Sequence, residues 1–175
     1  MQKALETLKA LSNEITIRVV FVCSGNIMRS PYAEMLFEKY IEERRHSERT
    51  IISESLAVTY RNSSILDQTQ DLLLENGVSP ERIAQFSPRH ISNHLEVCQK
   101  ADLIFCMTAD HLAALHDWQE KAFLLSKFVS GPDSEEIPDP FFSEDAWKAY
   151  SMVKEKVKGL VDLFEAAGLL DSHSK

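Results

Sequence analysis

Four short apolar runs are spaced along the chain, and the stretches between them carry apolar residues at helical spacing. The first run, residues 15–22 (ITIRVVFV), is nearly continuous in apolar character, which is typical of a strand buried on both faces of a parallel sheet. Similar runs predict strands at 50–57, 102–107 and 122–125. Helices are predicted at about 30–45, 64–76, 92–100, 108–117 and 144–167.

Strands that alternate with helices predict an α/β fold. We expect a single domain with a four-stranded parallel sheet, right-handed crossovers and helices on both faces. Residues 15–170 form this predicted domain, between an N-terminal extension (1–14) and a short tail (171–175). Leucines recur at helical spacing in the extension, which predicts an amphipathic helix over 2–12. Whether this helix packs on the domain, docks a partner or frays stays open.

The 175-residue chain is 44% hydrophobic and 26% charged, the balance of an ordinary globular domain, and its formal net charge is -8. Nucleic acids and anionic membranes need basic surfaces, so neither is an expected partner of this acidic chain. Cys23, Cys98 and Cys106 are too few for a secreted disulfide framework. The sequence shows no signal peptide and no apolar run of about 20 residues. We therefore expect a cytoplasmic protein that is a monomer or a weak dimer.

The segment 22–31 (VCSGNIMRSP) carries the candidate chemistry. It follows the first strand and leads into a helix, with Ser30-Pro31 predicted as cap and first-turn residue. Successive backbone amides at such a helix start form an anion site, and Gly25 lets the backbone fold tightly. The same field stabilises a thiolate at Cys23. Five residues separate Cys23 from Arg29, so the loop can curl and bring a planar guanidinium over the same pocket to grip phosphate.

A bare Cys-x5-Arg spacing does not identify a nucleophile, because most lone cysteines are buried structural thiols. At Cys23, the preceding strand, the internal Gly25 and the Ser30-Pro31 helix start favour the nucleophile. The six histidines have neither the spacing of a metal site nor the context of a catalytic triad. We expect no metal and no cofactor.

This loop resembles that of the low-molecular-weight protein tyrosine phosphatases, whose pattern is Cys-x-Gly-Asn-x-x-Arg-Ser-Pro followed by Ala-Glu. The resemblance spans about 15–168. Residues 101–111 are similar to the family's central strand and the helix after it, and 137–141 (IPDPF) to its acid loop. The residues that match the loop pattern are Cys23, Gly25, Asn26, Arg29, Ser30, Pro31, Ala33 and Glu34.

The resemblance implies a protein tyrosine phosphatase that acts on a phosphotyrosine protein substrate. Cys23 is then the nucleophile, which forms a phosphocysteine intermediate that water hydrolyses. Arg29 holds the phosphate, and Asp139 protonates the leaving phenolate before it serves as base toward water. The implied phosphate-binding loop consists of Ser24, Gly25, Asn26, Ile27, Met28 and Ser30 around the cysteine and arginine.

Asp139 lies in the segment 126–142, whose proline, glycine and acidic residues predict a long surface loop. Taken alone, an aspartate before proline is as readily a turn residue. Its place along the chain relative to the cysteine loop favours the role of an acid. Phe141 and Phe142 beside it are predicted to wall a slot for a phenyl ring, with Tyr60 as a candidate for the opposite wall.

Three other functions stay open. The related arginine phosphatases carry a small Thr where this chain has Ile27, and the bulkier side chain favours tyrosine. Arsenate reductases of the same fold use further cysteines as a redox relay, but Met28 stands where many relatives carry a second loop thiol. A catalytically weak phosphopeptide-binding module would not require both Cys23 and Asp139. After the second strand, Ser55 is a candidate support for the loop, although its neighbours depart from the family's usual Ser-Ala-Gly.

Overall fold

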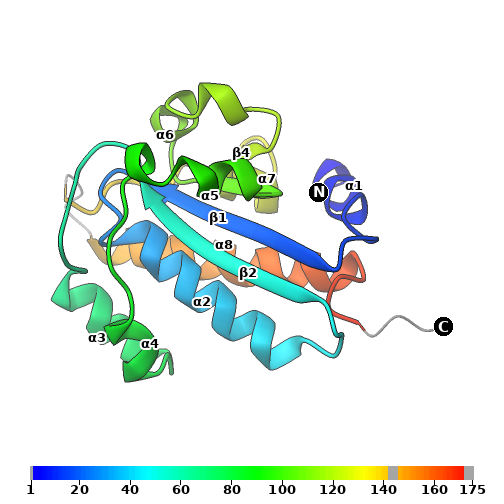
Figure 1. Cartoon of the computed structure of the whole chain (residues 1–175), viewed down its shortest axis with the longest axis horizontal. Coiled ribbons are helices and arrows are strands. Elements are labelled where there is room, and N and C mark those ends of the chain that lie inside the picture. Colours follow the sequence, from blue (N-terminus) through cyan, green and yellow to red (C-terminus); the bar gives the residue numbers. More distant parts are fainter. Residues whose placement is uncertain (1, 142–145, 172–175) are drawn as a thin grey trace.

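A parallel sheet of four strands, in the order β2-β1-β3-β4, forms the centre of the protein (Figure 1). The computed structural model describes residues 2–141 and 146–171. Every neighbouring pair of strands is parallel, as the nearly continuous apolar runs predict. The strands are β1 (Thr16–Cys23), β2 (Thr50–Ala57), β3 (Leu103–Cys106) and β4 (Ala122–Leu124).

The order of the strands reverses beside β1. The chain passes from β1 to β2 on one side and then returns to place β3 on the other side. In open α/β sheets, the crevice beyond the carboxyl ends of the strands at such a reversal is where ligands bind. Cys23 is the last residue of β1, so the loop that follows it opens into this crevice.

Helices cover both faces of the sheet, as predicted (Figure 1). One face lies against α2 and α8, and the other against α5 and the segment around α6. The α-helices are α1 (Gln2–Lys9), α2 (Arg29–Arg44), α3 (Asp67–Glu75), α4 (Pro80–Ala84), α5 (Leu95–Lys100), α6 (Ala109–Ala113), α7 (Leu125–Ser130) and α8 (Ala146–Ala166). Two short 3-10 helices are η1 (Ile91–Asn93) and η2 (His116–Trp118).

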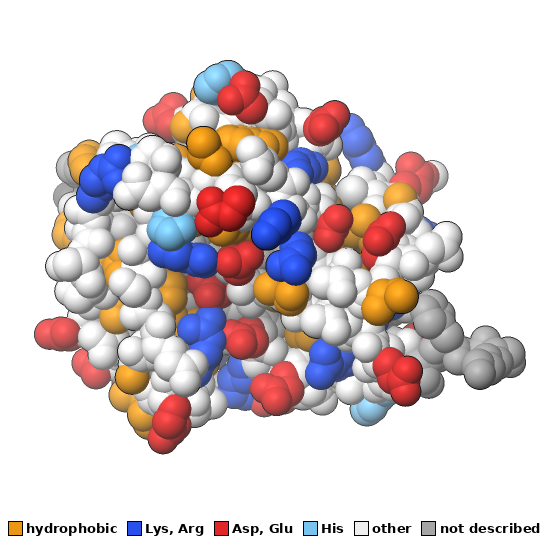
Figure 2. Space-filling model, viewed as in Figure 1, with side chains coloured by type: hydrophobic (Ala, Val, Ile, Leu, Met, Phe, Trp, Pro, Cys, Tyr) orange, Lys and Arg blue, Asp and Glu red, His pale blue; other side chains and the backbone are white. Residues whose placement is uncertain are grey.

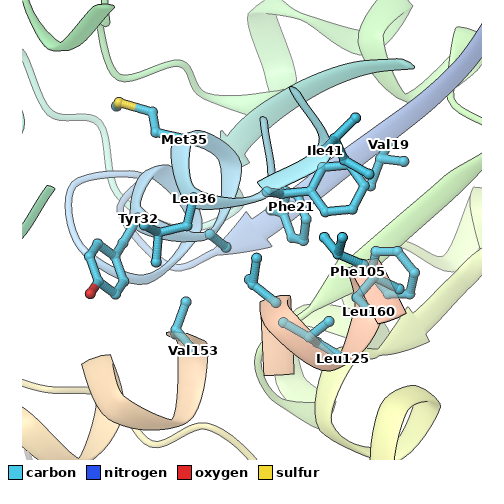
Figure 3. Packing of buried hydrophobic residues seen from close by; sticks show 14 of the residues in the cluster. Val19, Phe21, Tyr32, Met35, Leu36, Ile41, Phe105, Leu125, Val153 and Leu160 are labelled. Carbon is cyan, nitrogen blue, oxygen red and sulfur yellow. The ribbon is translucent and has the colours of Figure 1, made fainter. Parts of the chain in front are cut away.

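Strand β1 is apolar on both faces because both faces are covered. Phe21 packs against Phe37 of α2, with ring centroids 5.6 Å apart, and Phe37 packs in turn against Phe164 of α8 at 5.3 Å. Figure 3 shows Phe21 and Leu160 pointing into this interior. Val20, the neighbour of Phe21 along the strand, belongs to a second and smaller apolar cluster on the opposite face. Successive side chains of the strand thus pack against helices on opposite faces of the sheet.

The sequence prediction differs from the structure in several helices. The helix predicted at 92–100 is divided into η1 and α5, and the helix predicted at 108–117 ends as α6 at Ala113. Helix α4 was not predicted, and α7 occupies the first part of the segment 126–142 that was expected to be entirely loop. Helix α7 forms because Phe128 is buried and lies against Phe105 and Phe123, with centroid distances of 5.0 Å to each. These partners are distant in sequence or belong to another element, so local composition did not reveal them.

The predicted helix cap at Ser30 is also wrong. Helix α2 begins at Arg29, and Met28 stands at the cap position without a side-chain capping bond. The Ser30 side chain is fully buried and turns toward Cys23, at an Oγ–Sγ distance of 2.9 Å. The hydroxyl that could have capped the helix therefore faces the candidate site.

The N-terminal helix α1 packs on the domain. Ala4 and Leu8 are buried and belong to the same apolar cluster as α2 and α8. On the face drawn in Figure 2, basic side chains alternate with acidic ones and no broad area of one sign is visible. None of the helices in the described ranges is long and apolar enough to span a membrane.

Removal of the Leu8 side chain tests whether α1 contributes to stability. We expect Leu8→Ala to lower the free energy of unfolding by about 2–4 kcal/mol, because a fully buried leucine leaves a cavity. Urea denaturation measures the loss. The matched control is Lys9→Ala, an exposed position on the same helix, for which we expect a change within about 0.5 kcal/mol. Equal stability of both variants would indicate a frayed extension.

Candidate active site

The loop after β1 turns sharply at two adjacent residues. Asn26 has a φ of 54°, in the left-handed region that residues other than glycine rarely adopt. At Gly25, an added Cβ would lie 2.9 Å from the Asn62 side-chain nitrogen, which donates a hydrogen bond to the Gly25 carbonyl at 2.8 Å. A side chain at position 25 would therefore displace Asn62. Gly25 was predicted to let the loop fold tightly, and this close contact is the physical reason that it does so.

The Cys23 sulfur lies at the base of the loop and is the target of two hydrogen-bond donors. The backbone N–H of Asn26 donates to Sγ at 3.3 Å, and Ser30 Oγ lies 2.9 Å from Sγ. Ser30 Oγ already accepts a bond from Asn26 Nδ2 at 2.9 Å, so its own hydrogen is free to point at the sulfur. Both donors therefore converge on the sulfur.

The Asn26 side chain fixes the shape of the loop. Its Nδ2 also donates to Ser55 Oγ at 2.7 Å, and its Oδ1 accepts the backbone N–H of Arg89 at 2.9 Å. Every donor and acceptor of this fully buried amide is thus satisfied, which compensates for the strained backbone. Ser55, which comes from β2, lies behind the loop as one of these partners.

Arg29 is the buried cation of the site. Its side chain is only 3% exposed. Nη1 donates to the Ile137 carbonyl at 3.1 Å, and Nη2 donates to Ser24 Oγ at 3.2 Å and to Asp139 Oδ2 at 2.8 Å. The segment that carries Asp139 is therefore held against the cysteine loop through both a backbone carbonyl and a carboxylate. Ile137 N–H also donates to the Met107 carbonyl at 3.0 Å, which attaches the segment to the end of β3.

His111 is a member of the site that the sequence did not reveal. Its Nδ1 accepts the Thr108 N–H at 3.2 Å, so the proton is on Nε2 and donates to Ser24 Oγ at 2.9 Å. Burial, and next the positive charge of Arg29, lower the pKa of His111 to about 4. The imidazole is therefore neutral at pH 7 and orients the hydroxyl that Arg29 also contacts. His111 closes a Thr-x-x-His capping box at the start of α6, within the segment 101–111 whose resemblance to the family implied only a structural role for it.

A cavity of about 490 Å³ opens above the sulfur. The structure brings Cys23, Arg29 and Asp139 together along its wall. Tyr60 and Phe141 also line it and remain 55% and 63% exposed, so both rings are available to a ligand. Phe142 lies outside the described residues. The other lining residues are Ser24, Gly25, Ile27, Met28, Arg61, Asn62 and Pro140, of which Arg61 and Asn62 were not predicted.

Metal ligands are not grouped at the cavity. In the part of the chain that the structure describes, no three His, Cys, Asp or Glu side chains lie together as a metal site would require. What the cavity offers instead is a thiol, backbone amides and a guanidinium. Such a set of groups suits a phosphate ester or another oxyanion.

The fold and the site define an α/β protein with a cysteine-containing phosphate loop at the end of its first strand. Comparison with known proteins assigns it to a family: this chain belongs to the low molecular weight phosphotyrosine protein phosphatases, whose family model matches residues 18–168. The predicted four-stranded α/β fold and the resemblance stated from the loop are both confirmed.

Two relatives and one solved structure illustrate the range of the similarity. The protein-arginine-phosphatase of Bacillus subtilis (strain 168) is 30% identical over 129 residues, which cover 70% of this chain and 79% of that protein. The low molecular weight protein-tyrosine-phosphatase Wzb of Salmonella typhi is 32% identical over 150 residues, which cover 79% and 87%. The YwlE arginine phosphatase structure from Geobacillus stearothermophilus superposes with a TM-score of 0.72 at 23% identity, covering 91% and 99%. That last likeness concerns the fold alone.

The ion pair between Arg29 and Asp139 predicts that phosphate must compete with a carboxylate. We expect Asp139→Asn to bind inorganic phosphate about fivefold more tightly at pH 7, because a neutral amide competes weakly for the guanidinium and does not repel the anion. Isothermal titration calorimetry measures the affinity. Asp133→Asn, an exposed carboxylate on the same segment, is the control and should leave it unchanged. Weaker binding by Asp139→Asn would contradict this interpretation of the ion pair.

Proposed function

We propose that this protein is a protein tyrosine phosphatase that hydrolyses phosphotyrosine through a phosphocysteine intermediate. One observation carries the proposal: a thiol with two converging donors, a buried guanidinium and a carboxylate line the same cavity. Membership in a family of phosphatases supports it. In this proposal Cys23 is the nucleophile, Arg29 the phosphate ligand and Asp139 the general acid and base.

In the first step, the Cys23 thiolate attacks phosphorus while the bond from phosphorus to the phenolic oxygen breaks. Arg29 and the amides of the loop hold the equatorial oxygens as charge shifts among them. Asp139 gives its proton to the leaving oxygen. This proton matters because a phenol has a pKa near 10, so departure as a bare anion is costly.

In the second step, Asp139 removes a proton from water, and the water oxygen attacks the phosphorus of the phosphocysteine. The bond between phosphorus and sulfur breaks, inorganic phosphate forms, and Cys23 returns to a thiolate. Ser30 donates to the sulfur both when the sulfur attacks as nucleophile and when it departs as leaving group, because the sulfur carries negative charge at both times. The loop residues therefore serve both halves of the reaction.

Two aromatic side chains that line the cavity support the proposal of an aryl substrate. Tyr60, after β2, and Phe141, beside the acid, both line the cavity, so a phenyl ring can lie between them while its phosphate reaches the loop. Phe142 remains a prediction for the same wall. Ile27 also lines the cavity, and we infer that its bulk leaves less room beside the phosphate, which favours tyrosine over arginine.

A second candidate function is arginine phosphatase, because a relative with that name is 30% identical. The arsenate reductase alternative has less support. Cys98 and Cys106 are fully buried, and burial raises the pKa of the Cys98 thiol to about 11 and that of Cys106 further still. Thiols that are buried and protonated make poor members of a redox relay.

The remaining proposals concern the setting of the enzyme. We infer that the phosphatase domain comprises residues 15–170 and that its substrate is a phosphotyrosine protein. Three free cysteines, one of them the proposed nucleophile, suit a reducing compartment such as the cytoplasm. We retain a monomer or weak dimer as the expected assembly, without nucleic acid or membrane as partner.

Steady-state hydrolysis of an aryl phosphate and a phosphotyrosine peptide tests the proposed function. We expect turnover that a chelator does not change, its loss in Cys23→Ser, and a fall in kcat of about 10²- to 10⁴-fold in Asp139→Asn. Asp133→Asn should behave as the wild type. A wild-type protein that binds the phosphopeptide without hydrolysing it would instead be a binding module, and turnover of arsenate coupled to thioredoxin oxidation would indicate a reductase.

We expect Ile27 to determine whether the enzyme prefers phosphotyrosine or phosphoarginine as substrate. We expect the wild type to prefer phosphotyrosine peptide over phosphoarginine peptide, and Ile27→Thr to shift the ratio of the two kcat/KM values toward phosphoarginine by about tenfold. The reason is that threonine is one heavy atom smaller than isoleucine, which widens the cavity next to the phosphate. Ile27→Val has the size of threonine and should shift the ratio in the same direction, whereas Ile27→Leu keeps the size of isoleucine and is the control. Comparable turnover of both peptides by the wild type would refute the preference.

A further inference from the structure

A second groove lies between the N-terminal helix and the edge of the sheet formed by β4, and we call it the α1–β4 groove (Figure 1). Its volume is about 470 Å³, and it shares no lining residue with the substrate cavity. One wall is formed by α1, and the other by β4, by α7 and by the turn after α7. Helix α1 lies outside the residues 18–168 that match the family model, so one wall of this groove comes from outside the matched domain.

The floor of the α1–β4 groove is apolar. Phe123 of β4 and Phe128 of α7 line it, with their ring centroids 5.0 Å apart. Both rings also pack against Phe105 in the interior, at 6.3 Å and 5.0 Å. The base of the groove is therefore fixed by contacts within the protein, and an apolar body that displaces water from it gains free energy.

The charged residues that line the groove are two lysines, one on each wall. Lys3 of α1 and Lys127 of α7 are both exposed, and no Asp or Glu stands with them among the described residues that line the groove. Within the described ranges, neither ammonium group has an ion-pair or hydrogen-bond partner. Other lysines of the chain, such as Lys39 and Lys156, are each paired with a glutamate.

The contrast with the rest of the chain gives the groove a preference of sign. The formal net charge of the protein is -8, so most anions are repelled by its general field. At the α1–β4 groove, however, two unpaired cations face an apolar floor. A ligand complementary to this arrangement has an apolar body and a negative end. The volume of the groove lies in the range of small-molecule sites, which are about 300–1,000 Å³.

We propose that the α1–β4 groove binds a small amphipathic carboxylate, with an unbranched apolar chain of about eight to ten carbons. The chain lies on Phe123 and Phe128, and the carboxylate is bound by Lys3 and Lys127. Burial of the chain supplies most of the affinity, whereas the two lysines determine which end group is accepted. The inference does not rest on the proposed phosphatase function, because no residue of the substrate cavity takes part.

Titration of the full-length, ¹⁵N-labelled protein with decanoate, followed by NMR, tests the site directly. We expect saturable shift changes in the backbone amides of α1 and of residues 122–132, with a dissociation constant on the order of 10⁻⁴ M. Octanoate should bind about fivefold more weakly because it buries two fewer methylenes. Decyltrimethylammonium carries the same chain with a cationic end, and we expect it to bind at least about tenfold more weakly than decanoate.

Two variants test the assigned residues. An exposed ion pair contributes little, so we expect about a threefold loss of decanoate affinity for each lysine and about a tenfold loss in the double variant Lys3→Gln/Lys127→Gln. The matched control is Lys9→Gln/Lys154→Gln, which removes the same charge at two exposed positions outside the groove and should leave the affinity unchanged. Thr7→Trp places an indole in the groove from α1 and should abolish binding. If Thr7→Trp does not fold, the lysine variants carry the test.

Other outcomes would overturn the inference. Equal affinity for the cationic ligand, or an equal loss in the control pair, would leave adsorption to an apolar surface or an effect of net charge. Shift changes in residues 23–29, or competition by inorganic phosphate, would place decanoate in the substrate cavity instead. Sedimentation with phosphatidylglycerol vesicles in the absence of saturable decanoate binding would assign the groove to a lipid surface. None of these measurements needs turnover, so failure of the proposed phosphatase activity would leave the test intact.

Discussion

The guanidinium of Arg29 is a buried positive charge that water barely reaches, so the protein itself must supply its hydrogen-bond acceptors. At 3% exposure it depends on protein acceptors, which it finds in Ser24, in the Ile137 carbonyl and in Asp139. Two of these acceptors lie more than 100 residues further along the chain. The need to pair one buried cation therefore holds the acid segment over the cysteine loop, and places the proposed acid and nucleophile in one cavity.

A second constraint is the conformation of Asn26. A positive φ at a residue other than glycine persists only where the surroundings determine it, and here every polar atom of the side chain has a partner. The same amide connects the sulfur to the Glu34 carboxylate through two serines. The strain in the loop and the orientation of the donors toward the sulfur are therefore parts of one hydrogen-bonded network.

How far sequence predicted this protein depends on the range of the interactions involved. The four strands and the segment from Cys23 to Arg29 were predictable because an apolar run, a glycine and a helix start lie next to one another. The pairing of Glu34 with Arg82 and of Ser24 with His111 joins positions 48 and 87 residues apart. Ser30 shows the limit most directly: its local signal was that of a helix cap, but burial next to a sulfur overrides capping propensity.

The ion pair between Arg29 and Asp139 also bears on how the proposed acid becomes available to the leaving oxygen. In the proposed reaction, the arriving phosphate dianion takes the guanidinium, so Asp139 exchanges a cation for an anion as its nearest charged neighbour. The carboxyl is then released from the guanidinium and can face the leaving oxygen. The backbone bond from Arg29 to the Ile137 carbonyl does not depend on the carboxylate and can hold the segment in place during this exchange. Binding of the substrate would then itself prepare the acid, with no separate movement of the loop.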